Sequence, residues 1–356
     1  EHTMGSISVA DESGAVLVLT THANGTTLDA GDYGADAIIA VGASSGITST
    51  SSLVVLATAK TEATYNINLH DHFNNLKVNS SGKKFYLQQA STLGDSLTIT
   101  AGTVDTGGSN YALTVNSEVY INGGELSLNG STCNFGNVDL ESGTLNGNTA
   151  TINLNTGTGA GYVWFQDGGT WNHNTSTVVY KTNGKHIRSN SFYNLTIECA
   201  APGDDAVWRD NSGDTLTIAN DLTVKEGHFK RDYAPDIMVV TGDVSIEDGG
   251  KLGNLTETGA NTFGSLINGN VDIDGTFTNN DGTVVLTPSA NSSVWANNAS
   301  FYNLTISDVA YKITLRENIT VEATFSNLSA SASTETEIKN ITITLGTTST
   351  QGTLSG

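Results

Sequence analysis

Short runs in which apolar and polar residues alternate recur along most of the chain. Examples are Leu97-Thr98-Ile99, Leu113-Thr114-Val115 and Leu222-Thr223-Val224. A period of two residues is typical of a β-strand with one buried face, because successive side chains point to opposite sides of the strand. No long stretch keeps the 3.6-residue period of an amphipathic helix. The pattern therefore predicts an all-β protein.

Turn signals separate these short strands. They include Asn122-Gly123-Gly124, Asp248-Gly249-Gly250 and Asp281-Gly282. Glycine and asparagine suit tight corners because both tolerate a positive φ. The strand cores recur at irregular intervals, often of about 16 to 27 residues, which fits one turn, or coil, of a solenoid. We therefore expect a right-handed parallel β-helix, that is, a β-solenoid.

One longer phrase, Phe-x-Asn-Leu-x-(Val/Ile), occurs three times. Its copies begin at Phe73, Phe192 and Phe301, with spacings of 119 and 109 residues. We expect the copies to occupy equivalent coils, with the three phenylalanines buried. The asparagines of the phrase are predicted to form a buried ladder that bonds the backbone of their own turn and of neighbouring coils; they are Asn75, Asn194 and Asn303.

A second phrase precedes the last two copies. Gly169-Thr170-Trp171-Asn172 matches Gly275-Thr276-Phe277-Thr278, and both are followed by a Thr-Val-Val run. An array of Ig-like domains is the alternative interpretation, since such domains would repeat roughly every 100 residues. The very short strands and the dense Gly and Asn punctuation favour the solenoid.

These phrases, with the Leu-Thr-Ile and Leu-Thr-Val runs between them, resemble β-solenoid (parallel β-helix) repeats of phage fibres or tailspikes and of bacterial surface proteins. The resemblance covers roughly residues 61–325. It is a style of repeat and transfers no functional residue. It implies a structural protein that is extracellular or virion-associated.

Three regions are expected along the chain. Residues 1–60 are Ala-rich and lack the repeat phrase, so they predict a small N-terminal β cap or attachment domain. A cap is required because the first coil would otherwise expose an apolar core and unpaired strand groups. Residues 61–325 are the solenoid. Residues 326–356, rich in Ser and Thr, are expected to form a terminal coil and a tail.

Charge and cysteine content limit the partners. The formal net charge is -21, from 15 Lys and Arg against 36 Asp and Glu, which argues against binding nucleic acid or an anionic membrane surface. No apolar run is long enough to span a bilayer. The two cysteines, Cys133 and Cys199, lie several coils apart in a stack, so we expect two free and mostly buried thiols rather than a disulfide.

His70-Asp71-His72 is the sharpest local signal for a metal. Two imidazoles one residue apart project from the same side of a strand and can supply two ligands to a transition metal. Three chains on a threefold axis would supply six nitrogens, which resembles the His-x-His iron sites of some trimeric phage fibres. The preferred interpretation is nevertheless that His70 and His72 are solvated and that the protein holds no cofactor. Ca²⁺ at Asp-Gly turns or a transition metal at an oligomer axis is the alternative.

Two further groups could contact a ligand. The densest charge cluster runs from Lys225 to Asp236, beside a loop that runs from Asp204 to Asp214; on a β-helix enzyme such groups would act as acid and base. Among the aromatic residues, Trp171 and Phe277 are expected in the core. Trp208, in an acidic loop, is the best candidate for an exposed residue that binds a ligand such as a cell-surface glycan.

We therefore expect a non-enzymatic structural or attachment protein, most simply a phage virion fibre or spike-like component. It should form a homo-oligomer, a trimer by preference, because solenoid fibres cover exposed faces by symmetric packing. A virion protein or a cell-surface glycan is the expected partner. The alternatives are a bacterial cell-surface adhesin or appendage subunit, and a β-helix polysaccharide lyase or depolymerase.

Overall fold

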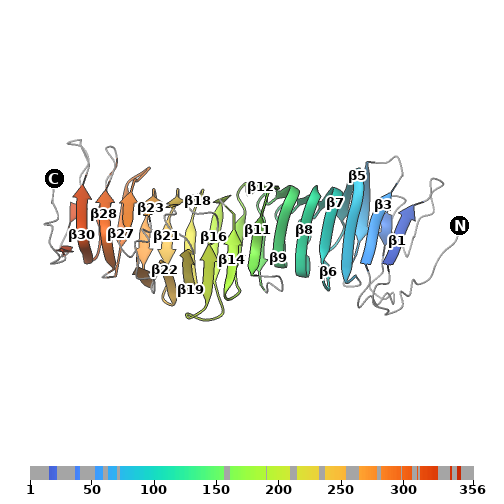
Figure 1. Cartoon of the computed structure of the whole chain (residues 1–356). Coiled ribbons are helices and arrows are strands. Elements are labelled where there is room, and N and C mark those ends of the chain that lie inside the picture. The colour runs from blue at the N-terminus through green and yellow to red at the C-terminus, as the bar shows by residue number, and fades with distance from the viewer. Residues whose placement is uncertain are drawn as a thin grey trace. The chain divides into compact units, whose positions relative to one another are not determined.

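The computed structural model shows an all-β protein whose strands stack in parallel as a β-solenoid (Figure 1). The solenoid prediction is confirmed, and the parallel pairing excludes the antiparallel Ig-like array. The structure describes residues 16–21, 37–40, 53–58, 63–69, 73–155, 161–189, 191–208, 215–231, 237–253, 264–278, 282–297, 299–306, 311, 313–327, 337–338 and 343–345. These residues contain no helix.

The chain divides into two compact units, Glu1–Thr177 and Val178–Gly356. The expected three-part division at residues 60 and 325 stays a prediction. The strands of the first unit are β1 (Val16–Thr21), β2 (Ala37–Ala40), β3 (Leu53–Thr58), β4 (Thr64–Asn68), β5 (Asn75–Leu87), β6 (Ser91–Leu93), β7 (Leu97–Asp105), β8 (Leu113–Ser127), β9 (Thr132–Asn146), β10 (Thr151–Leu154), β11 (Tyr162–Gln166) and β12 (Thr170–Asn172). Strand β13 (Thr177–Tyr180) begins where this unit ends.

In the first unit, each complete coil contributes strand segments to three faces. The first face holds residues 76–78, 97–99, 119–121 and 138–140, paired in parallel from coil to coil, and ends with β11. The second holds residues 84–87, 103–105, 125–127 and 144–146, followed by β12. The third holds β6, then residues 113–115 and 133–135, and β10.

The second unit repeats the three-faced plan with shorter strands. They are β14 (Lys185–Arg188), β15 (Ser191–Phe192), β16 (Asn194–Glu198), β17 (Asp205–Trp208), β18 (Thr215–Ile218), β19 (Leu222–Arg231), β20 (Ile237–Val240), β21 (Val244–Ile246), β22 (Gly250–Gly253), β23 (Gly264–Ile267), β24 (Val271–Ile273), β25 (Thr276–Thr278), β26 (Thr283–Leu286), β27 (Ser292–Trp295), β28 (Ser300–Ile306), β29 (Ile313–Leu315), β30 (Ile319–Asn327), β31 (Glu337–Ile338) and β32 (Ile343–Leu345). One series of parallel pairs runs β16–β19–β21–β24–β27–β29. A second runs β14–β17–β19–β22–β25, and a third runs β15–β18–β20–β23–β26–β28.

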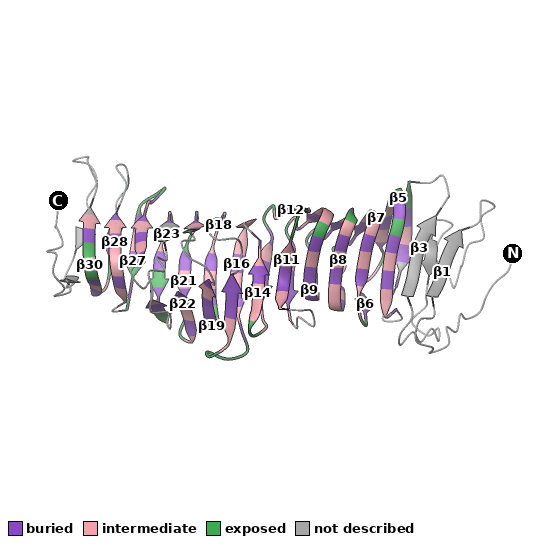
Figure 2. Cartoon of the chain, in the orientation of Figure 1, coloured by how far each residue is buried: buried purple, intermediate pink, exposed green. Residues whose placement is uncertain are grey.

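The core of each unit follows from the alternation seen in the sequence. Buried and half-buried residues alternate along single strands, as the stripes in Figure 2 show. Burial of the inward Leu, Ile, Val and Phe side chains drives the stacking, at about 1.5–3 kcal/mol for each one fully buried. Both cysteines are free and buried, as predicted, and burial raises the pKa of each thiol to about 12.

The three copies of the repeat phrase share one burial pattern. In each copy the Phe, the Leu and the final Val or Ile are buried, and the residues between them are half-buried. The exposed fractions of Phe73, Phe192 and Phe301 are 3%, 0% and 2%. The prediction that the three phenylalanines are buried is confirmed.

The expected equivalence of the copies is wrong for the second and third. Phe192 pairs with Ile218 in the β15–β18 series, and Leu195 pairs with Leu222 in the β16–β19 series. Phe301, by contrast, packs on Phe277 of β25 with ring centroids 5.3 Å apart, and Leu304 pairs with Val284 of β26. The two copies therefore turn different corners of the coil. The phrase specifies how a corner is turned, and the 109-residue spacing is not a whole number of coils.

Candidate functional site

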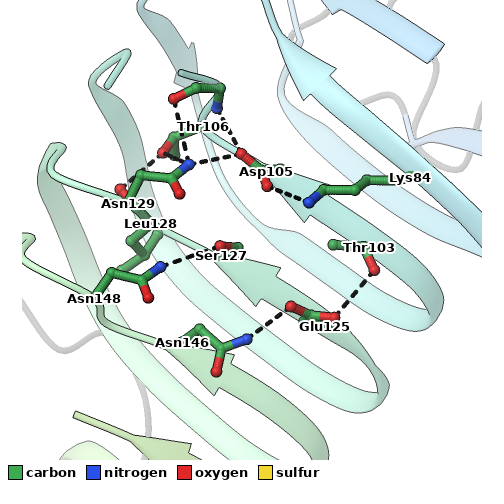
Figure 3. Close-up of polar contacts among 11 residues, drawn as sticks. Lys84, Thr103, Asp105, Thr106, Glu125, Ser127, Leu128, Asn129, Asn146 and Asn148 are labelled. Atoms are coloured by element: carbon green, nitrogen blue, oxygen red, sulfur yellow. Dashed lines mark hydrogen bonds and ion pairs between the residues drawn. The ribbon is translucent and has the colours of Figure 1, made fainter. Parts of the chain in front are cut away.

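The polar side chains of the first unit form columns that run from coil to coil. Thr103 donates to Glu125 at 3.3 Å, Asn146 donates to Glu125 at 2.7 Å, and Asn172 donates to Asn146 at 2.7 Å. Figure 3 shows the first three residues of this column beside a second pair, Asn148 and Ser127. Parallel register sets Thr103 beside Glu125 and Asn146 beside Asn172, so these side chains meet their counterparts in the next coil. Asn146 reaches Glu125 diagonally, because its own register partner in β8 is Ser127.

Asp105 is the centre of a junction between three coils in the same view. One carboxylate oxygen accepts from the Gly107 N–H at 2.7 Å and from the Asn129 amide at 2.6 Å, and the other lies 2.6 Å from Lys84 Nζ. Asp105 is 4% exposed. Burying a carboxylate is costly unless it is paired and hydrogen-bonded, and here both oxygens have donors.

Asparagines with a positive φ form the corner of this column. Asn110, Asn129, Asn148 and Asn174 have φ between 48° and 57°, the left-handed conformation that asparagine adopts more readily than most residues. The carbonyl of Asn129 accepts from the Thr149 N–H at 2.9 Å, and that of Asn148 accepts from the Thr175 N–H at 2.8 Å. The corner asparagines thus connect each coil to the next.

The second unit has a column in which side-chain oxygens accept backbone N–H groups. Asn194 accepts from Asp221 at 3.2 Å, Asp221 from Asp243 at 2.8 Å, Asp243 from Asn270 at 2.7 Å, and Asn270 from Ser293 at 2.9 Å. The other two phrase asparagines do the same: Asn75 accepts from Ser96 at 3.2 Å and Asn303 from Thr324 at 3.1 Å. The predicted bonds to neighbouring coils are confirmed, although these side chains are half-buried rather than buried.

Lys225 of the predicted charge cluster lies 3.5 Å from Glu198, whereas His228 and Lys230 meet at Asp205. Its carboxylate lies 2.7 Å from Lys230 Nζ and 3.3 Å from His228 Nδ1. His228 Nε2 contacts the Gly253 carbonyl oxygen, and the side chain is 7% exposed. Burial lowers the pKa of His228, although Gly253 and Asp205 favour its charged form. Both ring nitrogens face acceptors within the protein, so this imidazole joins three coils and offers no open position to a substrate.

Sequence reasoning missed a second group of charged and polar side chains, on the outside of β8 and β9. Glu118 and Tyr120 lie on β8, and Asn137, Asp139 and Glu141 on β9. Asn137 donates to Glu118 at 2.9 Å, and Tyr120 donates to Glu141. Burial raises the pKa of Asp139 to about 6, and the neighbouring charges of Glu118, Glu141 and Asp167 add to the increase. The alternation of side chains along each strand indicates that these residues face outward. Only the pairing of β8 with β9 shows that they are neighbours.

The structure corrects the prediction for Trp208. Its side chain is 3% exposed, and the indole N–H donates to the Ser189 carbonyl at 3.3 Å. Ala206 and Trp208 are both buried because they share the inward side of β17. The interpretation of Trp208 as an exposed ligand contact is therefore wrong. The core assignment of Trp171 and Phe277 is confirmed at 7% and 8% exposure. Trp295 is the tryptophan that reaches solvent, at 38% exposure.

The metal prediction cannot be placed, because His70 and His72 lie outside the described residues. Within the described part of the chain, no group of three or more His, Cys, Asp or Glu side chains is arranged to hold a metal ion. The described residues also include no helix long and apolar enough to cross a membrane. Comparison with protein-family models, with curated proteins and with solved structures found no match to this chain.

Proposed function

We propose that this chain is a non-enzymatic structural and attachment protein, a fibre or spike-like component of a phage virion that works as a homotrimer. The polar columns are the observation that carries the proposal. Thr103, Glu125, Asn146 and Asn172 bond one another from coil to coil instead of converging on one point, and the Asn194 to Ser293 column does the same. Such columns stiffen a stack along its length, which suits a rod.

The charged groups give further support. Asp105 and His228 are both buried, and their polar atoms are engaged by neighbouring coils. A catalytic acid or base needs an atom that reaches substrate. These two clusters therefore connect coils, and the depolymerase alternative gains no support from them.

The stiffness part is tested by limited proteolysis of the purified chain with a broad-specificity protease. We expect the solenoid to resist digestion for hours at 37 °C and light scattering to give the mass of a trimer. Rapid digestion throughout the solenoid, or a monomer at high protein concentration, would contradict the proposed fibre.

Two further measurements test the proposed location of the protein on the virion and the proposed lack of enzymatic activity. Immunogold labelling with an antibody against this chain should mark virions, whereas labelling of the envelope of uninfected cells would favour the adhesin. Incubation with capsular and algal glycans should release neither reducing ends nor unsaturated uronates. Release of either product in proportion to the concentration of this protein would contradict the non-enzymatic assignment.

A further inference from the structure

The outward side of β8, β9 and β11 combines carboxylates with aromatic rings. Val119 and Val138 face the core, so the alternate positions face outward. Parallel register sets Tyr120 beside Asp139, and Asp139 beside Phe165. Glu118 and Asn137 form the next row, also in register. We name this group of five residues, Glu118, Tyr120, Asn137, Asp139 and Phe165, the acidic aromatic face.

Two buried oxygens on this face have no hydrogen-bond donor. Asn137 is 5% exposed, and its Nδ2 donates to Glu118 Oε1 at 2.9 Å, so its amide lies within the group. The Oδ1 atoms of Asn137 and of Asp139 are both buried and lack a partner. Buried acceptors in native proteins nearly always have a donor, so two orphans two residues apart on one strand indicate that the face takes its donor from outside the chain.

The missing donor should carry a positive charge. Asp139 has Glu118, Glu141 and Asp167 as charged neighbours, and together with its own burial they raise its pKa to about 6. None of the five side chains of the face is cationic. A cationic donor would satisfy the orphan oxygens and also offset the repulsion between the carboxylates.

The rings distinguish between the cations that could bind. The described residues provide no arrangement of acidic or His side chains that would hold a metal ion. Half-buried Tyr120 and Phe165 flank Asp139 on either side, so their backbones are roughly 10 Å apart by strand spacing. Aromatic rings attract ammonium groups and pack against the apolar faces of flat ligands. A carboxylate between two rings therefore fits a ring-shaped ligand that carries an ammonium group.

We propose that the acidic aromatic face binds amino sugars, meaning glycans whose sugar rings carry free ammonium groups. Asp139 and Glu118 pair with the ammonium, the Asn137 carbonyl accepts a hydrogen bond from the sugar, and Tyr120 and Phe165 hold the ring. This site rests on the attachment role proposed above and names the class of surface that the chain would attach to.

Isothermal titration calorimetry with a hexamer of β-1,4-linked glucosamine tests the site, with the N-acetylated hexamer as the uncharged comparison. We expect saturable binding of the glucosamine oligomer and at least about tenfold weaker binding of the acetylated one. Asp139→Asn and Phe165→Ala should each weaken binding by about tenfold or more. Asp272→Asn and Tyr311→Ala change an exposed Asp and an exposed Tyr in the second unit, and should bind as the unaltered chain does.

The pH dependence of binding distinguishes recognition of the ammonium group by the Asp139 carboxylate from burial of the sugar ring alone. Affinity should rise above pH 5 as Asp139 ionises and fall again at higher pH as the sugar amines lose their protons. The rise, but not the fall, should disappear in Asp139→Asn. The site is overturned if the oligomer does not bind, if Asp139→Asn binds equally well, or if binding requires Ca²⁺ and is abolished by a chelator. Thermal unfolding of each variant verifies folding. Protease resistance of the same samples tests the rod separately, so loss of sugar binding alone leaves the structural role standing.

Discussion

The coils around β8 and β9 differ from those around β20 to β25. In the first unit, β8 and β9 each run for 15 residues and pass through all three faces of a coil as one strand. In the second unit, the same three faces are built from separate strands of three or four residues. A solenoid corner can therefore be turned either within a strand or by a break between strands.

Glycine explains the difference at the corners. Gly123 in β8 and Gly143 in β9 have φ of 117° and 81°, so the strand bends without leaving its ladder. A side chain at Gly143 would overlap the carbonyl oxygen of Gly124 in the preceding coil. In the second unit this device occurs within β19, at Gly227 with φ of 89°. From β20 to β25 the faces are instead built from separate strands, and the spacing of paired residues reaches 27 from Val244 to Val271.

The largest effects should come from the core, where the two kinds of coil are expected to behave alike. Phe73→Ala, Phe192→Ala and Phe301→Ala should each cost about 3–5 kcal/mol, because each removes a fully buried ring. Urea unfolding followed by tryptophan fluorescence measures this. Tyr311→Ala, at a side chain that is 42% exposed, should cost less than about 0.5 kcal/mol. A loss confined to one unit would mean that burial is not the common factor.

The next effect is specific to the bent-strand coils. Asp105→Ala should cost about 3 kcal/mol, since it leaves the buried Gly107 N–H and the Asn129 amide without their acceptor and Lys84 without its partner. Asp272→Ala, at an exposed carboxylate of β24, is the matched control and should lie within about 0.5 kcal/mol of the unaltered chain. Equal losses in the two variants would show that the three-coil junction adds no stability.

Corner glycines give a smaller effect that sharpens the comparison. Gly143→Ala should cost about 2 kcal/mol, because it combines a left-handed backbone with a backbone overlap. Gly82 also has a positive φ, 71°, but has open space around it, so Gly82→Ala should cost only about 1 kcal/mol. Gly108→Ala, with open space and no positive φ, should be neutral. If all three changes cost the same, close packing of coils does not select glycine at Gly143.

The side-chain to backbone columns should contribute about equally in both units. Asn194→Ala removes the acceptor of the Asp221 N–H, and Asn75→Ala removes that of the Ser96 N–H, each for about 1 kcal/mol. Thermal melts of the two variants measure the losses. Asn→Asp at the same positions keeps an acceptor oxygen and should recover most of the stability at pH 7. If neither Asn→Asp variant recovers stability, the loss in the alanine variants comes from the change in side-chain volume and not from the lost acceptor.

The smallest effect has the opposite sign and depends on pH. The folded pKa of Asp139, about 6, is above its unfolded value near 3.8, so the folded state holds the extra proton between these pH values. Stability should therefore fall as pH rises from about 4 to 6 and stay lower above that range. Asp139→Asn should remove this decline and stabilise the chain by about 1 kcal/mol at pH 7, allowing for solvent screening. Melting curves from pH 4 to 8 measure it, and an unchanged pH profile in the variant would exclude Asp139 as the cause.

Local pattern was sufficient for a large part of the structure. Alternation in Leu97-Thr98-Ile99 and Leu222-Thr223-Val224 predicted strands whose Leu, Ile and Val are buried, because side-chain direction alternates in any strand. The repeat phrase predicted buried phenylalanines and asparagines that bond the next coil. The spacing of Cys133 and Cys199 in a stack correctly predicted two free thiols rather than a disulfide.

Register between coils was decided only by the tertiary structure. Trp208 was predicted as an exposed residue from its acidic neighbours, but its place on the inward side of β17 buries it. The second and third repeat phrases turn different corners, because coil length varies and a spacing of 109 residues does not fix a face. The acidic aromatic face unites Tyr120, Asp139 and Phe165, which stand 19 and 26 residues apart in sequence. Alternation sets the side of a strand on which a residue lies, and only the pairing of strands sets which residues become neighbours.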